Sequence, residues 1–227
     1  MAEYIAPLRD IRFTLTELAD LNGVLALPDF NDTTPDLADA VLEEAAKFAG
    51  EVLSPLNAPG DKDGAKLPPA GVMAAGRFGI AYRQFVENGW GSMTGDTEYG
   101  GQGLPNLLGA AASEMWNASN MAFALCPMLT TGAVEAIRAH ASAELKARYL
   151  PNMIAGSWTG TMNLTEPQAG SDLAAVRARA VPVGDHYLIT GQKIFITWGD
   201  HDMTENVIHL VLARLPDAPE GTRGISL

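Results

Sequence analysis

The sequence predicts an α+β fold, in which an all-α domain over residues 1–156 precedes an incomplete, barrel-like β domain over residues 157–227. Two observations carry this prediction. Before residue 156, apolar residues recur at steps of three and four, which is typical of helices that bury one side. After it, apolar and polar residues alternate with a period of two, which is typical of strands.

Composition sets the broad class. Of the 227 residues, 47% are hydrophobic and 19% are charged, which is enough apolar side chain for a packed core. The net charge of −12 would repel phosphate backbones. No basic stretch followed by an apolar core opens the chain, and no run approaches the roughly twenty apolar residues of a membrane span. We therefore expect a soluble, cytoplasmic protein that binds neither nucleic acid nor membrane.

The first long helix has a clear start. Thr34 is placed to cap it, Pro35 suits its first position, and Asp36 favours its positive end. Five apolar residues follow at helical spacing and predict its buried stripe: Leu37, Val41, Ala45, Phe48 and Val52. Pro55 should end this helix, because proline lacks a backbone N–H.

Four further helices are expected before residue 156. One runs over Val72–Asn88 with Gly89 as its C-cap, and Leu107–Trp116 marks the next. The glycine-rich stretch Gly91–Pro105 between them should be a loop. The last two cover residues 130–140 and 142–153, the second capped by Ser142.

Strands are expected after residue 156. Residues 158–164 alternate, and Gly184-Asp185 separates two further runs, the second over His186–Thr190. Lys193–Thr197 and Val207–Leu215 are also rich in strand-forming residues. The final residues resemble the opening of another strand, so we expect the β domain to be cut short.

Several familiar sites are excluded. Gly100–Pro105 is not a dinucleotide-binding fingerprint, because Asn106 stands where a third glycine is needed and no strand precedes it; a tight interhelical loop is favoured. The chain has one cysteine, Cys126, which we interpret as a small buried hydrophobe. Its four histidines lack zinc-type spacing, so no metal site is expected. Neither a nucleophile elbow nor a phosphate loop is present.

Two segments combine the groups that a flavin requires. Met162–Asp172 is a strand that runs into a turn with free amides and a serine hydroxyl, and Lys193–Gly199 offers a flat aromatic, a hydroxyl and a glycine. A flavin needs an apolar face to stack on, donors along its polar rim and amides for its pyrophosphate. Alone, the first segment is more often a structural turn. The pair favours a flavin site.

Together these segments resemble the acyl-CoA dehydrogenase family. That family carries Leu-Thr-Glu-Pro-x-Ala-Gly-Ser-Asp, followed some twenty to thirty residues later by an aromatic-Ile-Thr step. Both patterns are present here, at Leu164–Asp172 and Phe195–Thr197, and Tyr99–Leu104 resembles a loop between early helices of the family. The resemblance runs from about residue 36 to the end, and it implies FAD as the cofactor.

The resemblance also implies roles for individual residues. Thr165 would donate to the pyrimidine rim of the flavin, Phe195 would pack on the ring, and Thr197 would reach its N5 region. Ser171 would lie near both the pyrophosphate and the thioester arm of CoA. The expected cofactor-binding residues are Met162, Leu164, Thr165, Gly170, Ser171, Phe195, Ile196 and Thr197. The expected substrate-binding residues are Ser171, Phe123 and Met128, with Leu125 beside them; ordinary core packing is an equal alternative for the last three.

Two departures from the family pattern affect the function. Trp198 stands where many members have asparagine, and Gly199–Asn206 resembles a bacterial branch of longer chains. That branch includes enzymes for medium, branched or sulfur-containing acyl-CoAs, among them 3-methylthiopropionyl-CoA dehydrogenases. The family's catalytic glutamate lies in a second helical domain beyond this chain. Glu166 belongs to the flavin-loop motif, so we expect no catalytic residue here.

The resemblance implies that the full-length protein removes hydrogen from the α and β carbons of an acyl-CoA. Electrons would pass to an electron-transfer flavoprotein or a similar acceptor, and the protein would be a homo-oligomer. This chain alone is expected to be inactive and to hold FAD weakly, since half a pocket gives part of the binding energy for most of the ordering cost.

Two alternatives stay open. One is a dehydrogenase-like flavoprotein that works as a DNA-damage-response or binding protein, which the net charge of −12 disfavours. The other is a purely structural helical interaction domain, which leaves the paired strand-end motifs unexplained.

Overall fold

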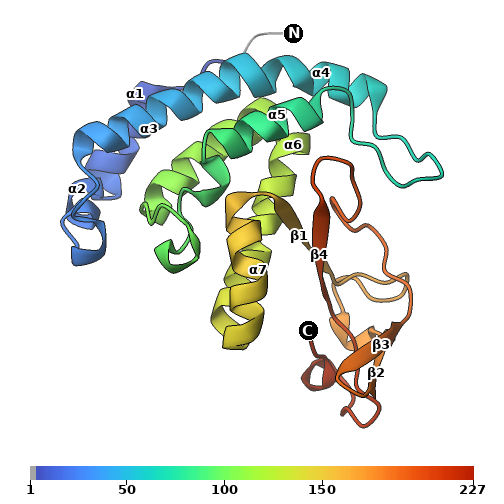
Figure 1. Ribbon diagram of the computed structural model, residues 1–227. Helices are drawn as coiled ribbons and strands as arrows, with labels where there is room; N and C mark the ends of the chain where they lie inside the picture. Colours follow the sequence, from blue (N-terminus) through green and yellow to red (C-terminus); the bar gives the residue numbers. More distant parts are fainter. Residues whose placement is uncertain (1–3) are drawn as a thin grey trace.

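A computed structural model describes residues 4–227 (Figure 1). Helices fill the N-terminal part, and strands follow residue 157. The α-helices are α1 Leu8–Phe13, α2 Leu21–Leu25, α3 Pro35–Lys47, α4 Ser54–Asp63, α5 Phe78–Glu87, α6 Asn106–His140 and α7 Ala143–Ala155. The strands are β1 Trp158–Asn163, β2 Arg179–Val183, β3 His186–Thr190 and β4 Asn206–Val211. In Figure 1, α3 and α4 form one long curved rod that lies across α5 and α6.

The start of α3 confirms the predicted cap, but its predicted end is wrong. The Thr34 hydroxyl accepts a hydrogen bond from the Leu37 N–H at 3.1 Å. The chain stays helical past Pro55, through a π-helical turn over Phe48–Leu53 and into α4. In this wider turn Ser54 N–H bonds to Ala49 C=O, five residues back. Pro55 then lies in the first turn of α4, where a missing backbone N–H breaks no hydrogen bond within the helix.

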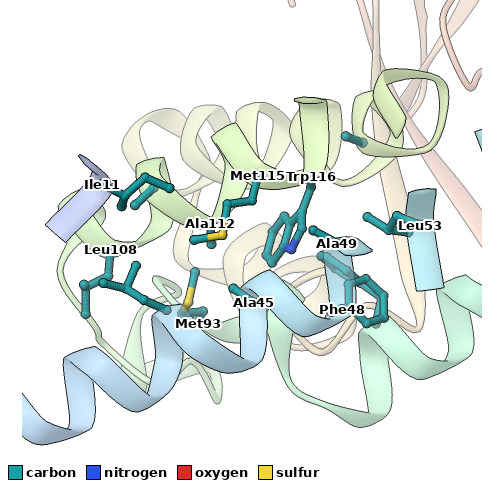
Figure 2. Close-up of a cluster of buried hydrophobic side chains, with 14 of the residues drawn as sticks. Ile11, Ala45, Phe48, Ala49, Leu53, Met93, Leu108, Ala112, Met115 and Trp116 are labelled. Atoms are coloured by element: carbon teal, nitrogen blue, oxygen red, sulfur yellow. The ribbon is translucent and has the colours of Figure 1, made fainter. Parts of the chain in front are cut away.

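The predicted buried stripe of this rod is confirmed in part: Ala45 and Phe48 are buried and Val52 packs against the core, but the stripe does not begin at Leu37. Leu37 is 44% exposed, and the residues below 2% exposure are Ala38, Leu42, Ala45, Ala49 and Leu53. Figure 2 shows Ala45 and Ala49 facing Met115 and Trp116 of α6. Small residues at the crossing let two helices approach closely, so the alanines, rather than the largest apolar residues, mark the centre of the contact.

Helix α5 begins at Phe78, six residues later than predicted, and its expected end is confirmed. Gly76 takes a φ of +45°, which is incompatible with a continuing helix, and Lys66 pairs with Met73 in the preceding loop. At the other end Gly89 adopts the left-handed conformation expected of a C-cap, with φ +74°. In Figure 1 the loop before α5 projects away from the helices.

Helix α6 is continuous over the two regions that the sequence predicted as separate helices, Leu107–Trp116 and residues 130–140. Its continuity is broken only locally, at Asn120, where φ is −158° and ψ is 83°. The Asn120 side chain makes two hydrogen bonds at this break. It donates to Leu53 C=O at 3.1 Å and accepts from Phe123 N–H at 3.1 Å, so it works as an internal N-cap.

By length and composition, α6 is long and apolar enough to cross a membrane, whereas the sequence led us to expect no membrane span. The central helix of a compact protein meets the same criterion. Here α6 packs against α3, α4, α7 and β1. Its most apolar window is 39% buried inside the described part of the chain.

The glycine-rich loop before α6 is a structural loop, as expected. A Cβ on Gly101 would lie 2.0 Å from the backbone of Gly95, so only glycine fits there. Backbone hydrogen bonds fasten the loop to itself, including Gly103 N–H to Gly95 C=O at 3.0 Å and Leu104 N–H to Met93 C=O at 2.9 Å. The loop therefore sets where α6 begins.

The predicted barrel is not seen in residues 4–227. The strands form two separate two-stranded sheets, with β1 parallel to β4 and β2 antiparallel to β3. The β2–β3 hairpin turns at Gly184, φ +63°, as expected. Trp158 pairs with Asn206 and Asn163 with Val211, and β1 packs on α6.

Two strand predictions need correction. Lys193–Thr197 is irregular rather than extended, because Phe195 takes a positive φ of 57° that no strand accommodates. The strand expected over Val207–Leu215 covers Asn206–Val211. Beyond it, only isolated bridges continue the pairing, from Ala213 to Ser226 and from Arg214 to Arg179.

Candidate functional site

The two motif segments lie side by side, although residues 173–192 separate them in the chain. Ile194 N–H donates to Thr165 C=O at 3.0 Å, and the Lys193 ammonium donates to Leu164 C=O at 3.1 Å. On β1, the buried Thr161 hydroxyl donates to Thr197 C=O at 2.8 Å. These bonds hold the second segment along the end of β1, so the two segments form one surface.

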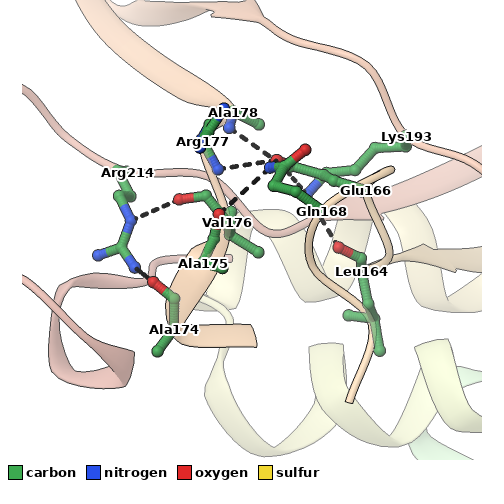
Figure 3. Close-up of polar contacts among 10 residues, drawn as sticks. All are labelled: Leu164, Glu166, Gln168, Ala174, Ala175, Val176, Arg177, Ala178, Lys193 and Arg214. Carbon is green, nitrogen blue, oxygen red and sulfur yellow. Dashed lines mark hydrogen bonds and ion pairs between the residues drawn. The ribbon is translucent and has the colours of Figure 1, made fainter. Parts of the chain in front are cut away.

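Glu166 organises the turn of the first segment. It is only 4% exposed, and its carboxylate accepts four hydrogen bonds (Figure 3). The donors are the Lys193 ammonium at 2.9 Å, the Arg177 N–H at 2.8 Å, the Ala178 N–H at 2.9 Å and the Gln168 amide at 2.6 Å. One buried carboxylate therefore ties the turn, the Lys193 segment and the start of β2 together.

The ionisation of Glu166 follows from these contacts. Burial alone would raise the pKa of its carboxyl, but the donors, Lys193 first, lower that pKa from 4.5 to about 2. A carboxylate that is always ionised, and whose oxygens are already occupied, is unsuited to taking a proton near neutral pH. The geometry agrees with the expectation that Glu166 is not a catalytic base.

Phe195 is strongly exposed to solvent. Its ring is 89% exposed, and its backbone lies in the left-handed region with φ +57°. Trp198, three residues on, also has a positive φ, of 53°. Non-glycine residues in this region are strained, and such strain gathers at functional sites. Ile196 beside it is half-buried, and Thr197 is exposed.

The remaining predicted cofactor residues line the same edge. Met162 and Leu164 are partly buried, and Met162 packs against the apolar cluster that includes Ala133 of α6. Thr165 is also partly buried, whereas Gly170 and Ser171 are exposed. The structure thus gathers the predicted cofactor residues on the turn and loop at the end of β1. Their roles stay predictions.

An apolar cavity of about 280 Å³ lies between α5, α6 and α7. Met128 of α6 lines it and is 47% exposed. The cavity also reaches Thr130, whose hydroxyl accepts a hydrogen bond from Gly160 N–H of β1 at 3.1 Å. The cavity and the strand that leads to the motif turn therefore share one wall.

Phe123, the other predicted chain-binding residue, is placed differently. Its side chain is fully buried, at 0% exposure, with its ring 5.8 Å from that of Phe78 and 6.0 Å from that of Phe85. It does not line the cavity. Phe123 thus packs in the core of the described chain, and its role as a substrate contact stays a prediction.

Sequence reasoning missed the residues that fix the loop after the second motif. The buried His201 lies 2.9 Å from the Thr159 hydroxyl through Nε2, and its Nδ1 accepts from Met203 N–H at 3.2 Å. Burial lowers the pKa of His201 from 6.5, which the charges of Asp200 and Asp202 oppose. No local pattern marks the burial of His201, because Thr159, the partner of its Nε2, lies 42 residues away in the chain.

Comparison with known proteins gives a consistent picture. The family description "Acyl-CoA dehydrogenase, N-terminal domain" matches residues 35–157. The chain is 51% identical over 225 residues to the 3-methylmercaptopropionyl-CoA dehydrogenase of Ruegeria pomeroyi, covering 99% of this chain and 38% of that relative. It is 39% identical to a butyryl-CoA dehydrogenase of Syntrophomonas wolfei, covering 98% and 37%.

Solved structures show the same fold. A chain from a structure described as an electron transferring flavoprotein of Acidaminococcus fermentans superimposes with a TM-score of 0.68 at 27% identity, covering 85% of this chain and 47% of that one. Butyryl-CoA dehydrogenase from Megasphaera elsdenii gives a TM-score of 0.69 at 23% identity, covering 85% and 47%. The chain spans less than half the length of these relatives.

Proposed function

This chain belongs to the acyl-CoA dehydrogenase family, and from that premise we propose that the protein containing it is an FAD-dependent dehydrogenase that oxidises an acyl-CoA between its α and β carbons. One observation carries the proposal. The hydrogen bonds from Ile194 and Lys193 to the carbonyls of Thr165 and Leu164 assemble the two motif segments into a single surface that presents Phe195.

The residues present suit a flavin. An aromatic ring that is 89% exposed, as Phe195 is, loses water-exposed apolar surface when a flat ring packs on it. The exposed Gly170 and Ser171 leave amides and a hydroxyl accessible to an anion. Bound FAD would supply the hydride acceptor.

The residues of this chain would bind the flavin and orient it against the substrate. Phe195 and Thr197 would hold one side of the flavin ring, with Ile196 behind them, and Met162 through Thr165 would line its rim. Ser171 would contact both the cofactor's pyrophosphate and the substrate's thioester arm. Positioning of this kind supplies much of the rate gain in such reactions. Proton removal requires a base, which Glu166 cannot supply with its pKa near 2.

We propose that the substrate carries a short acyl group. The cavity beside Met128 measures about 280 Å³, below the usual range of roughly 300–1,000 Å³ for ligand pockets. Two relatives act, by name, on 3-methylmercaptopropionyl-CoA and butyryl-CoA, which both carry short acyl groups.

We also propose several features of the whole protein. It would pass electrons to an electron-transfer flavoprotein or a similar acceptor, form a homo-oligomer, lie in the cytoplasm and act in fatty acid metabolism. We further propose that the chain divides into two domains near residue 156. The Acidaminococcus structure supports the partner through its description. The relatives described above give no support to a DNA-binding role.

The test uses the full protein, purified and examined for flavin absorbance. Short acyl-CoAs should bleach that absorbance, and the 227-residue chain alone should hold little FAD and turn over no substrate. Phe195→Ala should weaken FAD binding by at least roughly five-fold, since an aromatic pair contributes about 1 kcal/mol beyond burial. Tyr187→Ala, at a 55% exposed ring on β3, is the control and should bind FAD normally. A full protein without flavin, or with flavin that no acyl-CoA bleaches, would refute the proposal.

A further inference from the structure

Trp198 connects the second motif segment to α6. Its indole N–H donates to Ala122 C=O at 3.0 Å, across 76 residues of sequence. Its ring stacks on Phe78 at 6.2 Å between centroids, with 30° between the planes, and meets His201 edge-on at 5.5 Å. Helices α5 and α6, together with the loop that follows Trp198, therefore hold this side chain, which comes directly after Thr197.

The point of attachment on α6 is specific. Ala122 lies two residues after the break at Asn120, at the start of the second half of the helix. That half continues into Ala124, Pro127 and Met128, which line the apolar cavity. The indole hydrogen bond thus joins the motif segment to the part of α6 that forms the cavity wall.

The neighbouring residue is fixed from the other side. Thr197 C=O accepts from the Thr161 hydroxyl of β1 at 2.8 Å. Of these two consecutive residues, Thr197 is therefore held by β1 and Trp198 by α6. Trp198 keeps a positive φ of 53° in this arrangement. A non-glycine residue adopts that conformation only where the surrounding contacts over-determine it.

We propose that Trp198 is a positioning residue, which sets the spacing between the flavin-facing segment Lys193–Thr197 and the acyl cavity along α6. This inference rests on the proposed function. Trp198 need not touch cofactor or substrate. Instead, it would hold the ring-packing residue Phe195 at a fixed distance from the helix that receives the acyl chain, on which hydride transfer depends.

A simple packing role makes a different prediction. If Trp198 only fills space beside Phe78, then Trp198→Phe, which keeps an aromatic ring, should change little. If the N–H to Ala122 bond positions the segment, the same variant should loosen it. Trp158→Phe is the matched control, because Trp158 lies on β1 and packs against Tyr149 of α7 instead.

The first measurement is hydrogen–deuterium exchange in the full protein without added flavin. Amides of residues 193–199 should exchange roughly five-fold faster in Trp198→Phe, which is the effect of losing one net hydrogen bond, and should be unchanged in Trp158→Phe. Equal exchange in Trp198→Phe and the unaltered protein would overturn the inference. This readout needs neither FAD nor activity, so it stands even if the proposed function fails.

The second measurement is made with FAD and a short acyl-CoA. Trp198→Phe should lower kcat roughly ten-fold with KM within about two-fold, and should alter the visible circular dichroism of the bound flavin. A change in KM alone, or kinetics like those of Trp158→Phe, would overturn the positioning role. An unaltered protein that binds no flavin would instead refute the proposed function, leaving the exchange data to decide the attachment. A thermal midpoint within a few degrees of the unaltered protein would show that Trp198→Phe is folded. If it is not folded, Phe78→Leu replaces it: this variant removes the ring that stacks on Trp198 but keeps the indole N–H of Trp198, so exchange at residues 193–199 should stay near normal.

Discussion

Removing the charge of Glu166 should destabilise the fold far more than removing a surface carboxylate. In Glu166→Gln, the Lys193 ammonium, only 10% exposed, would lose its anionic partner. Breaking one side of a buried pair costs about 3–5 kcal/mol. We expect about 3 kcal/mol at pH 7, because the glutamine oxygen can still accept from one of the four donors.

The pH dependence gives an independent magnitude. The fall in the pKa of Glu166 from 4.5 to about 2 corresponds to about 3 kcal/mol in favour of the ionised form in the folded protein. Between those two pH values the unfolded chain binds a proton that the folded chain does not. The stabilisation is therefore present above pH 4.5 and is lost as the pH falls toward 2.

Urea unfolding followed by tryptophan fluorescence measures both effects. The difference in unfolding free energy between the protein and Glu166→Gln should be about 3 kcal/mol at pH 7 and should shrink steadily below pH 4.5. Glu44→Gln is the control. It breaks an ion pair with Lys47 in which both side chains are more than half exposed, and it should cost under about 0.5 kcal/mol. A loss at pH 7 no larger than the control's, or one independent of pH, would refute the reasoning.

Two further predictions concern the loops that frame the site. Because burial lowers the pKa of His201, the neutral ring stabilises the fold above pH 6.5, and this stabilisation should be lost as the pH falls below 6.5. In urea unfolding between pH 7.5 and 5.5, His201→Gln should therefore make the free energy of unfolding depend less on pH. Gly101→Ala should lower the free energy of unfolding by about 1–3 kcal/mol, and the thermal midpoint with it, since its Cβ would collide with Gly95. Gly132→Ala, in open space on α6, should raise that free energy by up to about 1 kcal/mol and the midpoint accordingly. Similar midpoints for the two alanine variants would contradict this account.

Local chemistry is where sequence reasoning succeeded. The caps at Thr34 and Ser142 are present, because a hydroxyl that accepts from an N–H three residues on needs no distant partner. Gly89, the predicted C-cap of α5, is likewise left-handed. β1 and the hairpin at Gly184 follow from alternation and turn chemistry in the same way.

The errors arose where distant residues decide the local conformation. Lys193–Thr197 has the composition of a strand, but hydrogen bonds to the β1 end and the attachment of Trp198 to Ala122 impose an irregular path, with a positive φ at Phe195 and another at Trp198 just beyond the segment. The break in α6 at Asn120 depends on Leu53, which is 67 residues away. Strand propensity and helical periodicity carry no record of such partners.

For the candidate site too, some features follow from the sequence and others only from the tertiary structure. The sequence by itself determined the two motif segments, their residue types and their family resemblance, because each lies within about ten consecutive residues. Only the tertiary structure decided that these segments adjoin, that Glu166 and Lys193 form a buried pair, and that Phe195 faces outward while Phe123 is enclosed. The physical reason is that exposure, ion pairing and pKa are set by neighbours in space, which here come from α6, β1 and the start of β2, and spatial proximity is a property of the folded chain.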